Sequence, residues 1–412
     1  MRIVDLFSGA GGLTFGFYYK LVNGTFVRNL NNDILFANEY INSAAEAFRT
    51  NFDNINMQEI DIRKLDEKKI RELIDGQEVD LIIGGPPCQS FSTVGQRRYD
   101  DKARLYQEYL RILSIIKPHM FLFENVKGIL SMREIFYELD ENGEVKYYEK
   151  EAKRSGKTII KKVPKIIGYG DYIMDKLKQT FEGIGYRINY KVLNAVDFGV
   201  PQNRERVFIV GIREDLNIDW QFPQPLGDKQ LTIKDAIGDL PIVGEDQQIQ
   251  NYDKSPQNAY QRLMRGECVN LTYHSCGTYG DKIRTVIKNV KQGQGKNDFN
   301  ALVDQGIINE KYRLTSGYAN TYGRLVEDEP STTITNNLST PSSLRCIHYS
   351  QDRALTSREG ARIQSFPDWF KFVGNKTEIN RQIGNAVPPL LSIILAERIF
   401  STLRSHSNES KK

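Results

Sequence analysis

The sequence predicts an α/β fold: a doubly wound, mostly parallel sheet accompanied by a smaller loop-rich domain. Through residue 128, short β-rich runs alternate with amphipathic helical patterns, the order typical of parallel strands joined by crossover helices. The alternation resumes from 171 to 213 and then fails until about residue 321, where prolines and loops dominate. A chain of 412 residues is also too long for one compact core.

Periodicity places the individual elements in order along the chain. Short apolar runs bounded by turn residues predict strands, and apolar residues recurring every three or four positions predict helices. Strands are expected at IVDLF (3–7), ILFANE (34–39), VDLIIGG (79–85), HMFLFENV (119–126) and ERVFIVGIR (205–213). Helices are expected within 43–52, 103–117 and 390–403, and a helix followed by a strand over 171–195.

Two stretches interrupt this order and suggest the domain boundaries. Residues 131–170 are rich in Glu and Lys, with a turn at DENGE, so we interpret them as an exposed insertion whose charges are solvated. The large domain is therefore expected at 1–213, the smaller domain at 214–321, and a return segment completing the large domain at 322–412.

Composition limits the class of protein. The 56 basic and 52 acidic residues give a net charge of +4, which permits an anionic partner without requiring one. Cys268, His274 and Cys276 lie close in sequence but lack a fourth ligand, so no metal site is expected. Four cysteines without paired spacing, no leader pattern and no run of 18 apolar residues predict a cytoplasmic protein that neither is secreted nor spans a membrane.

The segment DLIIGGPPCQSFST carries the first chemical signal. Pro86 and Pro87 fix the backbone where a buried strand ends, and they place Cys88 at the carboxyl edge of the sheet. A free cysteine is most often an inert core residue. The polar residues that follow Cys88 are a poor composition for a core, so a nucleophilic thiol is the preferred interpretation.

Two further strand ends carry polar groups. DLFSGAGG places glycines between the first strand and a helix, where backbone can approach a ligand, although such turns also occur without one. Glu39 ends the second strand, where a carboxylate can bind ribose hydroxyls. Glu124 ends an apolar strand, and there it is either a general acid with a raised pKa or an ordinary turn carboxylate.

Five motifs occur together in a fixed order, and in this order they resemble the DNA (cytosine-5) methyltransferase family of bacterial restriction-modification systems. They are DLFSGAGG, GGPPCQSFS, ENVKG, VPQNRERVFIVG and RQIGNAVPP. The resemblance covers 1–130, 171–213 and 322–400, and it implies a sheet of the S-adenosylmethionine-dependent methyltransferase type. It also makes 214–321 a target-recognition domain.

The resemblance implies roles for particular residues. Cys88 matches the nucleophile that adds to C6 of a cytosine flipped out of the duplex, and Glu124 matches the group at N3. Arg204, Arg206 and Gln202 match the segment that contacts the cytosine O2 and the nearby DNA backbone. The loop after Cys88, with Arg97 and Arg98, is expected to close over the DNA, and the DNA-binding set there is Gln89, Ser92, Arg97 and Arg98.

The cofactor implied by the resemblance is S-adenosyl-L-methionine. The positions that match its binding residues are Phe7, Gly9, Gly11, Glu39, Tyr40, Asp61, Ile62 and Asn385. Double-stranded DNA is the expected partner, with a cognate restriction endonuclease that need not touch this chain, and the protein is expected to be a monomer. Two alternatives remain open at this point: a tRNA cytosine-5 methyltransferase, and a catalytically silent, methyltransferase-like DNA-binding protein.

Overall fold

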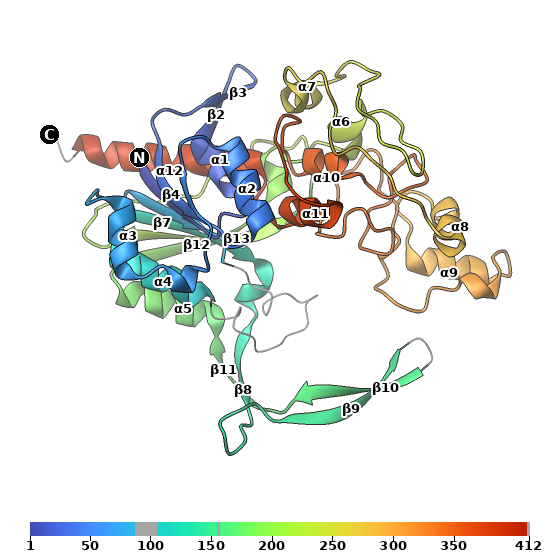
Figure 1. Ribbon diagram of the computed structural model, residues 1–412, viewed down its shortest axis with the longest axis horizontal. Helices are drawn as coiled ribbons and strands as arrows, with labels where there is room; N and C mark the ends of the chain where they lie inside the picture. Colours follow the sequence, from blue (N-terminus) through green and yellow to red (C-terminus); the bar gives the residue numbers. More distant parts are fainter. Residues whose placement is uncertain (87–104, 155–156, 410–412) are drawn as a thin grey trace.

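The structure is a computed structural model that describes residues 1–86, 105–154 and 157–409. Its centre is a seven-stranded sheet in the order β12-β13-β7-β6-β1-β4-β5 (Figure 1). The five strands from β7 to β5 run parallel, whereas β13 is antiparallel to both of its neighbours. The bounds are β1 Arg2–Leu6, β4 Asp33–Asn38, β5 Asn56–Gln58, β6 Leu81–Gly84, β7 Met120–Val126, β12 Tyr186–Asn194 and β13 Glu205–Arg213. The predicted α/β class with a mostly parallel sheet is confirmed.

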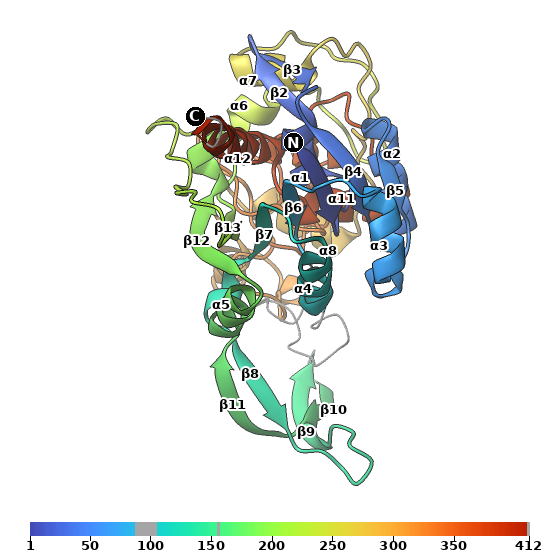
Figure 2. The same cartoon turned by 90° about the vertical axis from the view of Figure 1, so that its left-hand side faces the viewer.

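Helices cover both faces of the sheet because alternate strand residues point to opposite sides. Met120 and Leu122 of β7 join a core with α1, α2 and α12, whereas Phe121 and Phe123 join a second core with α3, α4 and α5 (Figures 1 and 2). The first set is α1 Gly12–Tyr18, α2 Asn42–Asn51 and α12 Pro389–Glu409, and the second is α3 Glu67–Ile74, α4 Leu105–Ile116 and α5 Ile173–Gly183. Burial on both faces explains why these strands have nearly continuous apolar sequences.

Helix α12 packs directly on α1. The Ser392 hydroxyl donates to the carbonyl of Leu13 and accepts from the amide of Gly16 at 3.2 Å. A Cβ at Gly16 would lie 2.2 Å from the Ser392 backbone, so only glycine permits this approach. One helical stretch in the described chain, Lys376–His406, has the length and composition of a membrane span, and 61% of its most apolar window is buried inside the protein. Such burial is typical of a core helix.

Short helices and long loops make up much of residues 214–321 and of the segment that follows. These helices are α6 Ile233–Ile237, α7 Ala259–Arg265, α8 Asp281–Asn289, α9 Lys296–Asp304, α10 Ser357–Ile363 and α11 Lys376–Asn385. Ile233 of α6 and Met264 of α7 share a core with Ile363 of α10, whereas Val286 and Phe299 belong to a separate small cluster around α8 and α9. Residues 214–321 and the segment that follows are joined by the fully buried guanidinium of Arg362. It pairs with Asp239 of the first (2.7 Å) and with Asp368 of the second (2.6 Å).

Three antiparallel hairpins were not expected from the sequence. The pair β2 Tyr19–Val22 and β3 Thr25–Arg28 follows α1. The predicted insertion forms an arm of two nested antiparallel pairs: β8 Arg133–Tyr137 with β11 Ile166–Tyr172, and between them in the chain β9 Tyr147–Arg154 with β10 Lys157–Pro164. The arm projects from the sheet domain (Figures 1 and 2). Its exposure agrees with the sequence analysis, but its strands were missed because charged residues occupy many of their positions.

Candidate active site

An ion pair between two neighbouring strands forms the centre of the site. Glu124 lies near the end of β7, and Arg206 is near the start of the antiparallel strand β13. Arg206 Nε lies 3.1 Å from Glu124 Oε1, and 13% of the Glu124 side chain and 15% of the Arg206 side chain remain exposed. The pair is therefore largely buried but still open to a ligand.

The backbone that leads to Cys88 passes directly beside this pair. A Cβ at Gly85 would lie 2.8 Å from Glu124 Oε2, so a larger residue where the chain leaves β6 would displace the Glu124 carboxylate. The Asn125 side-chain amide also donates to the Pro86 carbonyl at 3.4 Å. Cys88 itself lies outside the described residues, but the chain that precedes it by two residues is held against Glu124 and Asn125.

Burial and positive charge act on Glu124 in opposite directions. Burial raises the pKa of Glu124 above its usual 4.5, while Arg206 and then Arg204 lower it. A raised pKa increases the fraction of the carboxyl group that holds a proton near neutral pH. Glu124 can therefore donate a hydrogen bond or a proton to a basic ring nitrogen.

Arg204 lies behind this pair and is almost completely buried. Its guanidinium donates to the carbonyls of Ile334 at 3.1 Å and Gly384 at 2.9 Å, while its Nε has no partner among the described residues. Burial lowers the pKa of Arg204 well below its usual range, the nearby charge of Arg206 lowers it further, and Glu124 opposes both. The side chain thus links β13 to two distant segments, a contact that the sequence did not indicate.

A second cluster lies at the ends of β1 and β4. Gly9, with φ of +56°, donates its amide to Glu39 Oε2 at 3.0 Å, and Glu39 Oε1 accepts from the amides of Tyr40 (2.9 Å) and Ile41 (2.8 Å). Apart from Gly9 and its two chain neighbours, no atom of the described residues lies within 4 Å of the position that a Cβ would take at Gly9. The turn therefore leaves open space beside a buried carboxylate, which suits a ligand that approaches the backbone closely.

Asp5 belongs to the same cluster and was missed in the sequence analysis. It is fully buried at the end of β1, where one carboxylate oxygen accepts from the Thr14 hydroxyl and the other, Oδ1, has no partner among the described residues. Burial is the largest cause that raises the pKa of Asp5; the Thr14 hydrogen bond opposes it and the charge of Glu39 adds to it, so that the pKa rises from 3.8 to about 8. The available signal was an acidic residue inside an otherwise apolar strand, directly before the glycine-rich turn.

The last sequence motif returns to this turn. A Cβ at Gly12 would lie 2.6 Å from the carbonyl of Val387, so the segment after α11 presses against the start of α1. Asn385 is exposed at the end of α11, two residues before this contact. The structure therefore brings the first and last motifs together, although they are more than 370 residues apart.

The remaining predicted positions differ in their surroundings. Tyr40 is 54% exposed, Ile62 is buried, and Asp61 forms a 2.5 Å ion pair with Arg63, whose hydrogen bond lowers the pKa of Asp61. Gln202 is fully buried, with its amide bonded to Gln364 at 2.7 Å and to the amide of Ile334 at 2.8 Å, so both of its ends are used inside the protein. Phe7 has φ of +59° and Gly11 has φ of +94°. Gln89, Ser92, Arg97 and Arg98 lie outside the described residues.

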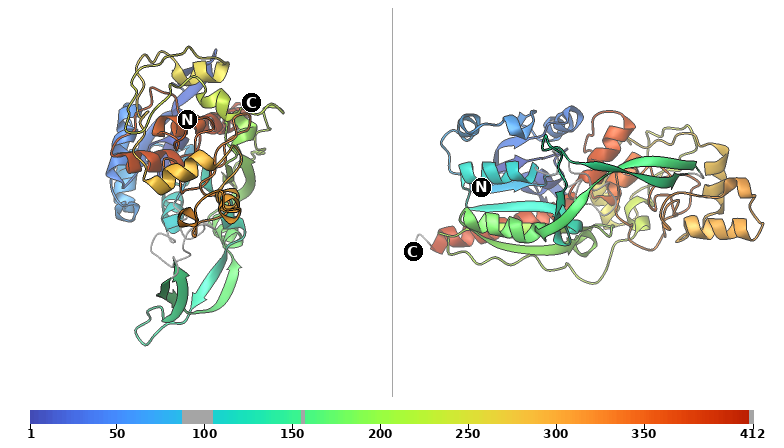
Figure 3. Two further views of the ribbon diagram at one scale, coloured as in Figure 1. Left: turned by 90° about the vertical axis from the view of Figure 1, so that its right-hand side faces the viewer. Right: turned by 90° about the horizontal axis from the view of Figure 1, so that it is seen from below.

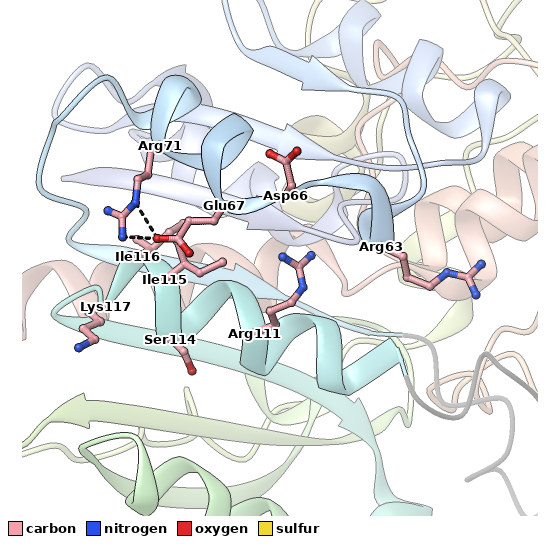
Figure 4. Close-up of a pocket in the computed structure, with 9 residues that line it drawn as sticks. All are labelled: Arg63, Asp66, Glu67, Arg71, Arg111, Ser114, Ile115, Ile116 and Lys117. Carbon is pink, nitrogen blue, oxygen red and sulfur yellow. Dashed lines mark hydrogen bonds and ion pairs between the residues drawn. The ribbon is translucent and has the colours of Figure 1, made fainter.

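A surface hollow of about 940 Å³ lies elsewhere, between α3 and α4 (Figure 4). It is lined by charged residues, but Arg71 already pairs with Glu67 and Arg111 with Glu108. The hollow includes none of the predicted site residues. Within the described chain, no group of three or more His, Cys, Asp or Glu side chains is placed to hold a metal ion.

Comparison with known proteins identifies the family. The profile of the C-5 cytosine-specific DNA methylases matches residues 1–147 and 163–401. The chain belongs to this family. Its activity is methylation of cytosine C5 in DNA, as the sequence resemblance predicted.

Individual relatives of this methylase match over nearly their whole length. The Type II methyltransferase M.AgeI of Thalassovita gelatinovora is 31% identical over 97% of this chain and 99% of its own. M.FnuDI of Fusobacterium nucleatum, also a Type II methyltransferase, is 32% identical over 100% of this chain and 98% of its own. A crystal structure described as a DNA modification methyltransferase encoded within a prophage (E. coli) has a TM-score of 0.69 at 23% identity, covering 98% of this chain and 99% of that one, and shares the fold.

The buried carboxyl group of Asp5 predicts a pH-dependent stability for the methylase without ligand. Because its pKa is about 8 in the folded chain and 3.8 in a typical unfolded one, the folded state binds more protons between these values. The free energy of unfolding should therefore fall as pH rises from about 5 to 8, by at most about 1.4 kcal/mol per pH unit from this group. Asp5→Asn should remove this contribution, so the stability of the variant relative to wild type should increase with pH. Denaturant unfolding of both proteins at several pH values measures it, and parallel pH profiles would contradict the assignment.

Proposed function

We propose that the methylase flips a cytosine out of duplex DNA and methylates it through a covalent bond between Cys88 and C6, with Glu124 at N3. The observation that supports this most strongly is the close approach of the Glu124 carboxylate to the position that a Cβ would take at Gly85. Gly85 begins the short segment that leads to Cys88, so this approach supports a joint role for Glu124 and Cys88. The same carboxylate is paired with Arg206, which belongs to the segment proposed to contact the cytosine O2 and the nearby DNA backbone.

The chemistry requires both a nucleophile and an acid. C5 of cytosine is a weak nucleophile, and addition of the Cys88 thiolate to C6 makes C5 electron-rich. Glu124 hydrogen bonds or protonates N3 as electron density moves onto the ring. Bound S-adenosylmethionine supplies the methyl group to C5. Loss of the C5 proton and departure of the Cys88 thiolate then restore the ring, and sulfur suits both the attack and the departure.

S-adenosylmethionine is proposed to bind at the ends of β1 and β4. Three features at these strand ends fit this ligand: the open space at Gly9, the Glu39 carboxylate, which suits ribose hydroxyls, and a buried Asp5 oxygen that has no partner among the described residues. The full proposed set is Phe7, Gly9, Gly11, Glu39, Tyr40, Asp61, Ile62 and Asn385. Asn385 enters this set through the contact of Val387 with Gly12.

The biological setting is proposed from the relatives. M.AgeI and M.FnuDI are Type II methyltransferases, so we assign this chain to the modification half of a restriction-modification system. A cytoplasmic location and a monomeric state are proposed from the sequence analysis alone. Residues 214–321 would select the DNA sequence, and Arg97 and Arg98 would contact DNA from the loop after Cys88. Phosphate contacts position a protein on DNA, whereas contacts to base edges determine sequence.

A methyl-transfer assay tests the function directly. The purified protein is incubated with labelled S-adenosylmethionine and either duplex DNA or tRNA, with Cys88→Ala as the matched variant. We expect label only in duplex DNA and only with the wild-type protein, because the variant lacks the thiolate. Label in tRNA alone would assign a tRNA methyltransferase, and no label with a protein that binds duplex would assign the silent DNA-binding alternative. More than a few percent of wild-type turnover by Cys88→Ala would exclude Cys88 as the nucleophile.

Glu124→Gln should slow methyl transfer by roughly a hundredfold to ten-thousandfold, the range typical of a general acid. Duplex binding should persist because the amide keeps the size of the side chain. Glu182→Gln, at the exposed end of α5, is the matched control and should turn over like wild type. Single-turnover kinetics on the same duplex measures the effect, and equal rates for the two variants would exclude the acid role.

Glu39→Gln should weaken S-adenosylmethionine binding by about ten- to a hundredfold, since a hydrogen bond to a charged group contributes about 1.5 to 3 kcal/mol. Duplex affinity should change far less. Glu46→Gln, exposed on α2, removes the same charge nearby without touching the turn. Calorimetric titration with the cofactor measures both variants, and wild-type affinity in Glu39→Gln would refute the proposed ribose contact.

A further inference from the structure

The distal hairpin of the arm, β9 with β10, concentrates positive charge. Residues 146–165 contain eight Lys or Arg and two Glu, an excess of six that is larger than the net charge of +4 of the whole chain. At the root of this hairpin, Lys146 and Lys165 both pair with Glu138, at 3.0 Å and 2.5 Å. The cations further along the strands carry the unbalanced charge.

The strand register separates the described charges onto two faces. Residues directly opposite one another in an antiparallel pair lie on the same face. Lys150 is opposite Lys161, on the face that also carries the Tyr148–Val163 pair. On the other face, Lys162 is opposite Glu149. The first face therefore has two cations and no acid among its described residues, whereas the second face is mixed.

The lysine pair is unfavourable unless an anion covers it. Like charges directly opposite in a sheet repel one another and destabilise the pairing. Lys150 and Lys161 are both exposed, and neither forms an ion pair with any described residue. A two-stranded hairpin standing alone is at best marginally stable in water. An anionic surface laid on this face would remove the repulsion and add packing.

The position of the arm indicates which anionic surface this is. The arm begins at Arg133, seven residues after the end of β7, the strand that carries Glu124. It therefore leaves the domain at the carboxyl ends of the strands, where the candidate active site lies. Figures 1 and 3 show β9 and β10 extending from there along the side of the molecule on which α8 and α9 lie. Eight residues per strand span roughly 27 Å, about the length of eight base pairs of duplex.

The distal hairpin is also an addition to the family pattern. The methylase profile matches 1–147 and 163–401, so the unmatched segment coincides with β9 and β10. The chemistry shared by the family is therefore encoded outside this hairpin. The positive charge of the β9–β10 hairpin is therefore explained more simply by binding of an anionic partner than by a role in catalysis.

We propose that the face of the β9–β10 hairpin carrying Lys150 and Lys161 contacts the phosphate backbone of the DNA duplex, outside the methylated base. The inference rests on the proposed action on duplex DNA. The contact is sequence-independent, because a lysine ammonium group meets phosphate as a point charge. The arm and residues 214–321 would then hold the duplex from different sides of the site.

Neighbouring residues on β10 provide a matched test. Lys161→Gln and Lys162→Gln remove the same charge from consecutive positions that face opposite ways, and Lys150→Gln/Lys161→Gln removes the whole pair. Fluorescence anisotropy with a mixed-sequence duplex of about 40 base pairs, at several salt concentrations, gives the slope of log affinity against log salt. We expect the slope to fall in magnitude by about 0.9 for each phosphate that the variant no longer neutralises, hence by about 1.8 in the double variant. Lys162→Gln should retain the wild-type slope. Lys161→Arg should also retain it, because arginine keeps the positive charge at this position.

Two results would overturn the proposal. A wild-type slope in Lys150→Gln/Lys161→Gln would show that these cations do not touch DNA and that the face serves another partner or none. An equal loss in Lys161→Gln and Lys162→Gln would show an effect of net charge without a defined face. Binding is measured without methyl transfer, so it is independent of the roles of Cys88 and Glu124. If the lysine variants change the salt slope as expected but the wild-type protein transfers no methyl group, the DNA contact stands and only the proposed function is contradicted.

Discussion

The buried guanidinium of Arg204 is the constraint on which the active-site edge depends. A buried charge costs several kcal/mol unless it is well paired, so the carbonyls of Ile334 and Gly384 must be in place for β13 to start where it does. This contact fixes Arg206 two residues later, and Arg206 in turn holds Glu124. The orientation of the proposed acid is thus determined by chain segments far from it in sequence, and the two guanidinium groups limit how far burial raises its pKa.

The sequence predicted the sheet well because its strands are buried on both faces. Strands β6 and β7 are nearly continuous apolar runs, and Glu124 was recognisable as a polar group where one of them ends. Asp5 was missed because the glycines of DLFSGAGG were enough to predict a ligand-binding turn, and the acidic residue before them was not considered. The burial of Arg204 and Gln202 had no local signal, since arginine and glutamine are usually exposed and their partners lie more than 100 residues away. The arm was missed because its charges hide the alternation of its strands.

Function in this chain is divided between rigid and projecting elements. The carboxylates of Asp5, Glu39 and Glu124 all lie at strand ends of one sheet, where burial shifts the pKa of each upward. Such positions vary little in geometry, which suits chemistry that needs fixed distances. The arm has no buried side chain among its described residues, and loops make up much of residues 214–321. They suit a long, charged partner whose surface is repetitive, because small displacements there cost little binding energy.

The contact between Gly12 and Val387 has a consequence for how the protein is made. Every residue of α1 is buried, and α1 packs on α12, which is synthesised more than 370 residues later, so this part of its cover is absent until then. A chain that stops before residue 387 would lack both this cover and one wall of the glycine-rich turn. These two segments, distant in sequence, therefore act as one structural unit. Premature termination anywhere between them should yield a chain that is degraded, leaving no partly active product in the cell.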